Sequence, residues 1–168
     1  MKILIVVDMQ RDFITGSLGS DMAQKIVPNV VEKVKNFAGK VIFTRDTHFE
    51  NYLETQEGKK LPVNHCIKDT EGWQICDELK PYVNEVVDKF TFGSIDLPEI
   101  IKNIGENIEE IELCGLCTDI CVISNAMILK AAFPEMNISV DSSCCAGVTA
   151  ESHNIALCAM KAVQIEIK

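Results

Sequence analysis

The sequence predicts an α/β protein, a three-layer α/β/α sandwich around a central, mainly parallel six-stranded sheet. Two observations lead to this prediction. Short apolar runs of strand length alternate along the chain with longer stretches in which apolar residues recur every three or four positions. This alternation is typical of βαβ units around a parallel sheet. The short runs are also continuous and rich in β-branched residues, as expected for strands that are buried on both faces.

Each predicted element follows from its local pattern. The strands are expected at residues 2–8, 40–46, 84–90, 108–116, 138–144 and 165–167. The helices are expected at residues 23–37, 97–104, 119–132 and 150–163, where apolar residues have helical spacing. Pro98 and Thr149 suit the starts of the second and fourth helices, and Pro134 suits the end of the third.

Composition limits the classes of function. A chain of 168 residues that is 47% apolar is long enough to bury its own core, so we expect one domain over residues 1–168. The net charge of −9, with no cluster of Lys and Arg longer than a pair, argues against a nucleic-acid partner. The amino-terminal apolar run of five residues is too short for a signal peptide or a membrane span, which predicts a cytoplasmic protein without a membrane partner. Most of the eight cysteines are expected to be reduced and buried.

Polar residues gather at the carboxyl ends of the predicted strands. Asp8 follows the first strand, Asp46 and His48 follow the second, Lys89 lies near the end of the third, and the turn at residues 117–121 follows the fourth. In an open α/β sheet these ends share one edge, and ligands bind there. This edge is therefore the predicted site.

One long connection interrupts the alternation of strands and helices. Residues 47–81 contain the only Trp and two of the three His. A connection of this length in a compact domain is usually functional.

The stretch CGLCTDICV, residues 114–122, has three cysteines and admits three interpretations. Cys114 and Cys117 have the CxxC spacing of a redox pair or of half a zinc site, but the second half of a zinc knuckle is missing. Cys121 falls in the first turn of a predicted helix, where free backbone N–H groups favour a thiolate and can hold an oxyanion. We therefore favour a nucleophile at Cys121. A redox or binding module that uses Cys114 and Cys117 is the non-enzyme alternative.

A thiol nucleophile also needs a base and an orienting charge. His153 falls in a predicted helix elsewhere, so a Cys/His pair has no obvious partner. Asp8 and Lys89 come from strand ends at the same edge and could fill these roles. Each has a structural alternative, because such an Asp often serves only as a turn residue and such a Lys is usually solvated.

Three segments resemble the catalytic segments of the cysteine hydrolases that include nicotinamidases and isochorismatases. They are VVDMQRDF at residues 6–13, VDKFTFGS at residues 87–94, and CGLCTDICV, which contains the specific pattern GxxTDxCV. The resemblance covers essentially the whole chain. It implies that Cys121 is the nucleophile, Asp8 the base and Lys89 the third catalytic residue. It further implies a cis peptide between Leu116 and Cys117, so that the backbone amides of Cys117 and Cys121 form an oxyanion hole.

The segment RDTH…LPVNHC resembles the metal site of the amidases in this family. The resemblance implies that Asp46, His48 and His65 bind a divalent metal ion, zinc first, with manganese or iron as alternatives. Two imidazoles and a carboxylate suit such an ion. Glu57 is a further candidate ligand. From spacing alone the histidines would be surface residues, but simple isochorismatases lack the full triad, so the motif favours the amidase branch.

The substrate pocket departs from the family pattern. Leu61 stands where nicotinamidases usually carry Trp, and Phe49 replaces a Pro, whereas Phe13 is retained and can pack on a planar substrate. We predict a metal-binding cysteine hydrolase of small amides that converts nicotinamide to nicotinate and ammonia through a thioester. The alternatives on this scaffold are hydrolases of an isochorismate-like vinyl ether, or of N-carbamoyl and other linear amides.

The resemblance also implies a reaction sequence. Asp8 takes the proton of Cys121 and later returns it to ammonia, and water activated by Asp8 or the metal then hydrolyses the thioester. Lys89 is expected to keep the pKa of the Asp8 carboxyl low. Dimers or larger homo-oligomers are implied as well, although no residue pattern identifies an interface.

Overall fold

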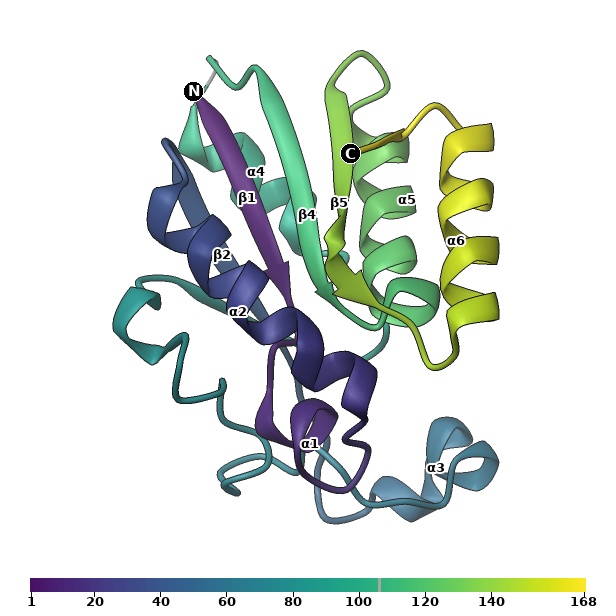
Figure 1. The fold of residues 1–168 in the computed structure, drawn as a ribbon. Coiled ribbons are helices and arrows are strands. Elements are labelled where there is room, and N and C mark those ends of the chain that lie inside the picture. The colour runs from purple at the N-terminus through teal and green to yellow at the C-terminus, as the bar shows by residue number, and fades with distance from the viewer. Residues whose placement is uncertain (106) are drawn as a thin grey trace.

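The computed structural model describes residues 1–105 and 107–168 and has the predicted α/β architecture (Figure 1). The strands form one six-stranded sheet in the order β3-β2-β1-β4-β5-β6. They are β1 (Lys2–Val7), β2 (Lys40–Asp46), β3 (Val86–Lys89), β4 (Glu110–Leu116), β5 (Asn137–Ala146) and β6 (Glu166–Ile167). Every neighbouring pair is parallel, so the predicted fold class is confirmed.

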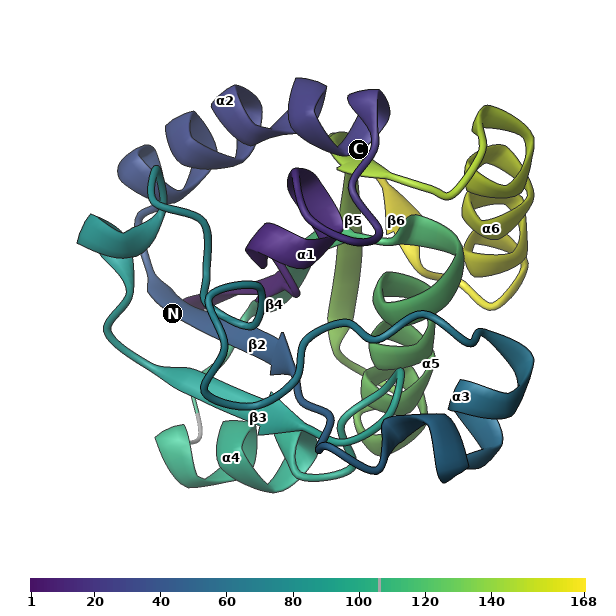
Figure 2. The same ribbon diagram turned by 90° about the horizontal axis from the view of Figure 1, so that it is seen from below.

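Helices cover both faces of the sheet. The helix α2 (Asp21–Asn36) crosses one face together with the short α1 (Arg11–Ile14), while α4 (Leu97–Ile104) and α5 (Ile123–Ala132) cover the other, with α6 (Ala150–Ala162) beside α5 (Figures 1 and 2). The chain moves from β1 toward one edge and from β4 toward the other, and right-handed crossovers therefore place the helices on opposite faces. Three predicted helices lie within two residues of their expected limits. The helix predicted at residues 119–132 is divided into the π-helical turn η3 (Thr118–Val122) and the α-helix α5 that follows it.

The centre of the sheet forms the core. In β1 the apolar run Ile3–Val7 is completely inaccessible to solvent. The apolar face of α2 packs against the sheet through Ala23, Ile26, Val27, Val30 and Val34. Ser20 caps this helix by accepting a hydrogen bond from the Ala23 N–H at 3.1 Å. The predicted periodicity therefore corresponds to real burial on both sides of the sheet.

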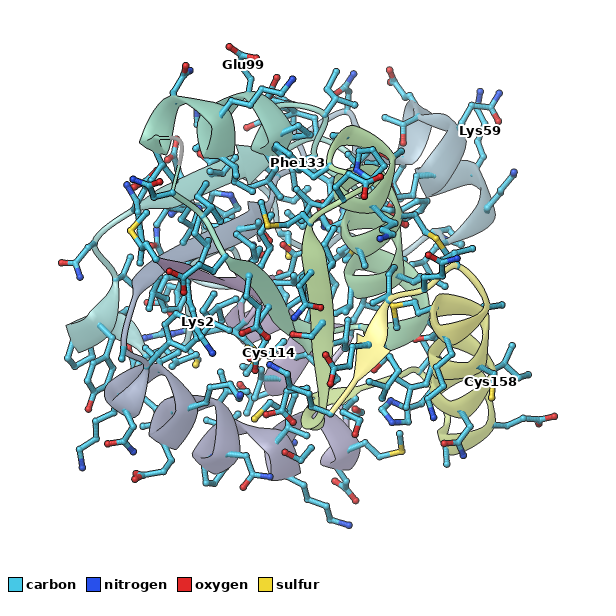
Figure 3. All side chains as sticks on the ribbon, turned by 90° about the horizontal axis from the view of Figure 1, so that it is seen from above. Lys2, Lys59, Glu99, Cys114, Phe133 and Cys158 are labelled. Atoms are coloured by element: carbon cyan, nitrogen blue, oxygen red, sulfur yellow. The ribbon has the colours of Figure 1, made fainter. Side chains whose placement is uncertain are left out.

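The eight cysteines are free thiols, and six of them are buried. Cys114 is inaccessible within β4, as predicted, whereas Cys158 lies on the outer side of α6 (Figure 3). In the part of the chain that the structure describes, none of the helices combines the length and the apolar character needed to cross a membrane.

The carboxyl ends of the strands meet at one edge, which Figure 2 views from below. The connection from β2 to β3 folds beneath this edge. It contains η1 (Tyr52–Glu54), α3 (Gln56–Lys60) and η2 (Lys80–Tyr82), so it is less irregular than the sequence suggested. Trp73 anchors this connection to the end of β2. Its Nε1 donates to Thr47 Oγ1 at 2.8 Å, and the Arg45 guanidinium lies 3.3 Å above its ring.

Candidate active site and metal centre

The structure brings Asp8, Lys89 and Cys121 together at the carboxyl edge of the sheet. Asp8 directly follows β1, Lys89 ends β3, and Cys121 lies in η3 after β4. Lys89 Nζ is 2.6 Å from Asp8 Oδ2 and 3.5 Å from Cys121 Sγ. All three residues are buried, with at most 4% of their surface exposed. A carboxylate and a thiol that contact the same ammonium are therefore withdrawn from water.

Lys89 is shared between two carboxylates. Its Nζ also lies 3.0 Å from Asp46 Oδ1 and donates to the Thr91 carbonyl at 3.0 Å. Burial by itself lowers the pKa of Lys89, but Asp8, Cys121 and Asp46 outweigh burial and raise this pKa well above its ordinary value. The ammonium therefore stays charged, because a buried cation is stable only beside anions.

Burial raises the pKa of Asp8 above its ordinary value, and Asp46 adds to the rise. Lys89 and the hydroxyl of Thr44, which donates to Asp8 Oδ1 at 2.6 Å, oppose the rise without cancelling it. The expectation that Lys89 keeps this pKa low is wrong, because removal of the carboxyl from water is the stronger effect.

Burial also raises the pKa of the Cys121 thiol, against the opposing effect of Lys89. The position at a helix start therefore does not produce the thiolate that the sequence suggested. A protonated thiol requires a base, and a carboxylate of raised pKa is well matched to accept its proton.

The chain turns sharply before Cys121. Gly115 has a φ of 119° and lies so close to Val7 that an added Cβ would be 2.1 Å from the Val7 carbonyl oxygen, so glycine is required. The peptide bond between Leu116 and Cys117 is cis. The Cys117 carbonyl then accepts the N–H groups of Ile120 and Val122 at 3.1 and 3.0 Å. This turn places Cys121 at the edge of the sheet.

Asn125 connects Cys121 to the loop after β3. Its Nδ2 donates to the Cys121 carbonyl at 2.8 Å, and its Oδ1 accepts from the Ser94 N–H at 2.9 Å. Asn125 is completely buried. Sequence reasoning missed this residue, although its position one helical turn after Cys121 was a usable signal.

Four further side chains converge beside Lys89. The ligand atoms of Asp46, His48, Glu57 and His65 all lie within 4.8 Å of one another. His48 Nε2 is 2.9 Å from Asp46 Oδ2 and 3.5 Å from Glu57 Oε1, and His65 Nε2 is 3.8 and 3.7 Å from the same two oxygens. The three residues expected at the metal site thus lie together with Glu57, which comes from α3.

The chemistry of this donor set fits a divalent metal ion. Among the described residues, the buried His48 Nε2 has no hydrogen-bond partner, since the approach of Asp46 Oδ2 does not have hydrogen-bond geometry. A buried polar atom without a partner requires an explanation, and an ion would supply one. His65 Nδ1 lies 2.8 Å from the Val63 carbonyl, which favours Nδ1–H as donor and leaves Nε2 as the ligand atom.

Two residues of the segment DMQRDF hold the backbone at or next to two of the candidate metal ligands. Gln10 Nε2 donates to the Asp46 carbonyl at 2.8 Å, and Gln10 Oε1 accepts from the Asp46 N–H at 2.7 Å. Asp12 Oδ2 accepts from the Cys66 N–H at 2.7 Å, directly after His65. Sequence reasoning assigned neither role, although both residues belong to a segment that it singled out.

Aromatic rings wall the metal side of the site. The Tyr52 ring centroid is 4.6 Å from that of His48 and 4.9 Å from that of His65, and the Phe13 ring is 5.6 Å from His65. Tyr52 also donates its hydroxyl to the Leu61 carbonyl at 3.0 Å. Nothing in the sequence pointed to Tyr52, because only the fold of the β2–β3 connection brings it here.

Both clusters border one cavity of about 510 Å³. Its lining includes Phe13, Leu61, Phe92, Ile120 and Val148 as apolar walls, Cys117 and Cys121 on the nucleophile side, and Asp46, Glu57 and His65 on the metal side. None of the described residues that line it is a lysine or an arginine. The cavity therefore suits a small, neutral and largely apolar molecule.

The fold and the comparisons with known proteins define the class of hydrolase to which the chain belongs. The family model of the isochorismatase domain matches residues 2–167, and the chain therefore belongs to the isochorismatase family. A nicotinamidase from Saccharomyces cerevisiae is 24% identical over 176 residues, which is 76% of this chain and 80% of the relative. An uncharacterized isochorismatase family protein from Bacillus subtilis is 30% identical over 144 residues, 75% of this chain and 76% of that protein.

Solved structures agree with this assignment. The pyrazinamidase of Pyrococcus horikoshii in complex with zinc matches with a TM-score of 0.84 and 26% identity, over 99% of this chain and 98% of that one. A nicotinamidase/pyrazinamidase from Bacillus subtilis matches with the same TM-score, identity and coverage. The predicted membership of the cysteine hydrolases, in the nicotinamidase branch that acts on amide C–N bonds, is thus confirmed.

Proposed function

We propose that this protein is a metal-dependent amidase that converts nicotinamide to nicotinate and ammonia through a thioester on Cys121. The observation that carries this proposal is that one cavity is lined both by Cys121, which contacts Lys89 beside Asp8, and by three of the four candidate metal ligands, Asp46, Glu57 and His65. A planar amide with a ring nitrogen can face the thiol at one end and the metal side at the other. The relatives named as nicotinamidases and pyrazinamidases support this choice of substrate.

In the proposed reaction Asp8 accepts the thiol proton of Cys121, and the sulfur attacks the amide carbon. The electron pair of the C=O bond moves to oxygen, where the backbone N–H groups of Cys117 and Cys121 hold the oxyanion. The C–N bond then breaks as protonated Asp8 gives its proton to the departing ammonia. Water that has lost a proton to Asp8 hydrolyses the thioester and frees nicotinate. Lys89 stabilises the negative charge that passes between Asp8 and Cys121.

Asp46, His48 and His65, with Glu57, would hold the metal ion, and zinc is the first candidate for this donor set. When bound, the ion supplies a Lewis acid for the ring nitrogen of the substrate. The protein itself orients the ring between Phe13 and the apolar wall that contains Leu61.

The cavity favours a neutral amide over isochorismate. Isochorismate carries two carboxylates, and a site for it would need cationic partners. The described lining residues offer carboxylates but neither lysine nor arginine, and Lys89 is committed to Asp8 and Asp46 behind the lining. Glu57 adds no positive charge to the lining either, although burial raises the pKa of its carboxyl.

Ammonia release from nicotinamide and benzamide, by wild type and Cys121→Ala, tests the proposal. Benzamide is the matched control because it has the same amide and ring size without the ring nitrogen. We expect the wild type to hydrolyse nicotinamide much faster than benzamide, and a chelator to remove this preference. Cys121→Ala should be inactive on both. Activity that survives in Cys121→Ala would contradict the nucleophile, and equal rates on the two amides would contradict recognition of the ring nitrogen.

A further inference from the structure

His153 lies directly behind the nucleophile's turn. Its Nδ1 is 2.8 Å from the hydroxyl oxygen of Thr118, which is the first residue of η3 and follows Cys117. The sequence correctly placed His153 in a helix, but the inference that this helix lies elsewhere is wrong. The parallel crossover from β5 packs the start of α6 against η3.

The loop before α6 is attached to the same turn. The Asp119 carboxylate accepts the Val148 N–H at 3.1 and 3.4 Å. Gly147 touches His153 so closely that an added Cβ would be 2.9 Å from the His153 Cβ. A capping box at Thr149 fixes the first turn of α6. His153 is therefore held on a rigid support and reaches the turn from a defined direction.

We propose that His153 is a positioning residue for this reaction: by holding the Thr118 hydroxyl, it fixes the backbone amides of Cys117 and Cys121 that receive the oxyanion. The inference rests on the proposed function, which assigns those amides their role. Thr118 is completely buried, so its hydroxyl needs a partner within the protein, and His153 supplies one.

The geometry explains how a contact behind the turn can reach the chemistry. Thr118 lies between Cys117 and Cys121, and the Cys117 carbonyl accepts two N–H groups of the same turn, so these residues move as one unit. His153 is not among the residues that line the cavity, so it does not bind substrate itself. Its loss should lower kcat and leave KM nearly unchanged, because oxyanion donors act only in the transition state.

Two matched pairs of variants test this inference. His153→Ala removes the ring but keeps the Cβ that packs on Gly147, whereas His153→Asn offers an amide oxygen close to the place of Nδ1. Thr118→Val removes the hydroxyl, and Thr118→Ser keeps it. We expect His153→Ala and Thr118→Val to lower kcat about tenfold to hundredfold, as displaced reacting groups do. His153→Asn and Thr118→Ser should recover most of the activity.

A double variant and a neighbouring residue complete the design. The variant with both His153→Ala and Thr118→Val should be no slower than Thr118→Val alone, because both changes remove one interaction. Asn154→Ala, at the exposed next position of α6, should keep the wild-type rate. An effect of His153→Ala on KM rather than kcat would overturn the positioning role, as would equal losses in His153→Asn and His153→Ala at wild-type thermal stability.

A readout that does not need turnover separates this inference from the proposed function. Iodoacetamide alkylates Cys121 without forming an oxyanion, so the alkylation rate should be unchanged in His153→Ala. Pyridine-3-carbaldehyde adds to the sulfur through its carbonyl carbon and places the electron pair on oxygen. Its protection of Cys121 against alkylation should therefore weaken in His153→Ala and return in His153→Asn.

A wild type without nicotinamidase activity would defeat the proposed function alone, and unchanged protection would defeat the role of His153. If His153→Ala does not fold, Thr118→Val and Thr118→Ser provide the same comparison.

Discussion

Two clusters of charged side chains lie at opposite ends of the parallel strands. The carboxylate-rich cluster, defined as Asp8, Asp46, Glu57 and Lys89, lies at the carboxyl ends that Figure 2 faces. The ion-pair network lies toward the other end, where Figure 3 labels Lys2. It consists of Lys2, Lys33, Lys168, Glu110, Glu112 and Asp141. The ammonium of Lys2 lies 2.9 Å from the Glu110 carboxylate, that of Lys33 lies 2.7 Å from Asp141, and that of Lys168 lies 2.8 Å from Glu112.

The two clusters differ in charge balance. The ion-pair network matches three ammonium groups with three carboxylates, and the side chains of its lysines reach solvent, with exposures of 52%, 19% and 35%. Burial opposes ionisation of Glu110, but its lysine contacts lower the pKa of this carboxyl to about 2. In the carboxylate-rich cluster three carboxylates face one ammonium. Burial raises the pKa values of Asp8 and Glu57, whereas the pKa of Asp46 is lowered because its contacts with His48 and Lys89 outweigh its burial.

This contrast indicates what each cluster is for. Balanced ion pairs neutralise one another and so contribute to stability, whereas an excess of buried carboxylates leaves negative charge for a proton or a cation to neutralise. Substitutions at the two ends should therefore have different consequences.

The largest effect is expected for Asp8→Asn. An amide cannot accept the thiol proton, so kcat for ammonia release should fall about a hundredfold to ten-thousandfold, the range for loss of a general base. Lys89 keeps Asp46 as a partner, so the fold should persist by circular dichroism. Glu112→Gln, in the ion-pair network, is the matched control and should keep the wild-type kcat. Asp8→Asn with more than a tenth of the wild-type rate would exclude Asp8 as the base.

Lys89→Met should damage both activity and stability. It leaves two buried carboxylates without their ammonium, and removal of one partner of a buried pair typically costs about 3–5 kcal/mol. Lys89 opposes the burial that raises the pKa of Asp8 and helps to lower the pKa of Asp46, so its loss should raise both values. The deficit should then shrink as the pH falls from 7 and these carboxyls become protonated. Urea unfolding in chelator at pH 7 and pH 5 measures this. A deficit that does not depend on pH would mean that the lost packing, rather than charge, is responsible.

The elements of the fold and the identity of the site were largely predictable from the sequence. Apolar periodicity places strands and helices because burial is the main local signal. Asp8, Lys89 and Cys121 could be named from short motifs. The pKa directions of Asp8 and Cys121 could not be predicted, because they depend on complete removal from water. Tyr52 and His153 could not be placed either, since only long-range packing brings them to the site.

A moderate effect is expected for His65→Ala on metal binding. Loss of one imidazole should weaken zinc affinity at least tenfold, since even indirect contacts to a metal contribute that much. Calorimetric titration with zinc measures the change without turnover. His153→Asn is the matched control, because it replaces the remaining histidine, which lies outside the metal cluster. Equal zinc affinity in wild type and His65→Ala would show that His65 is not a ligand.

The smallest effect is expected for Glu110→Gln, which should lower the free energy of unfolding by about 1–2 kcal/mol at pH 7, because its lysine partners are partly solvated. It should leave kcat unchanged. The Gln retains an acceptor for the Ser139 hydroxyl, which lies 3.0 Å from the carboxylate. Glu109→Gln, at the exposed neighbouring position, should have almost no effect.

The pH window of the Glu110→Gln deficit distinguishes the two clusters. The folded pKa of Glu110 is about 2 against an ordinary value of 4.5, so its contribution is complete above pH 4.5 and is lost as the pH falls toward 2. The Glu110→Gln deficit should thus stay constant between pH 7 and pH 5, where the Lys89→Met deficit already shrinks. Urea unfolding of both variants over this range compares them directly. A Glu110→Gln deficit that shrinks in the same range as that of Lys89→Met would mean that the two clusters do not differ in the way their charges are balanced.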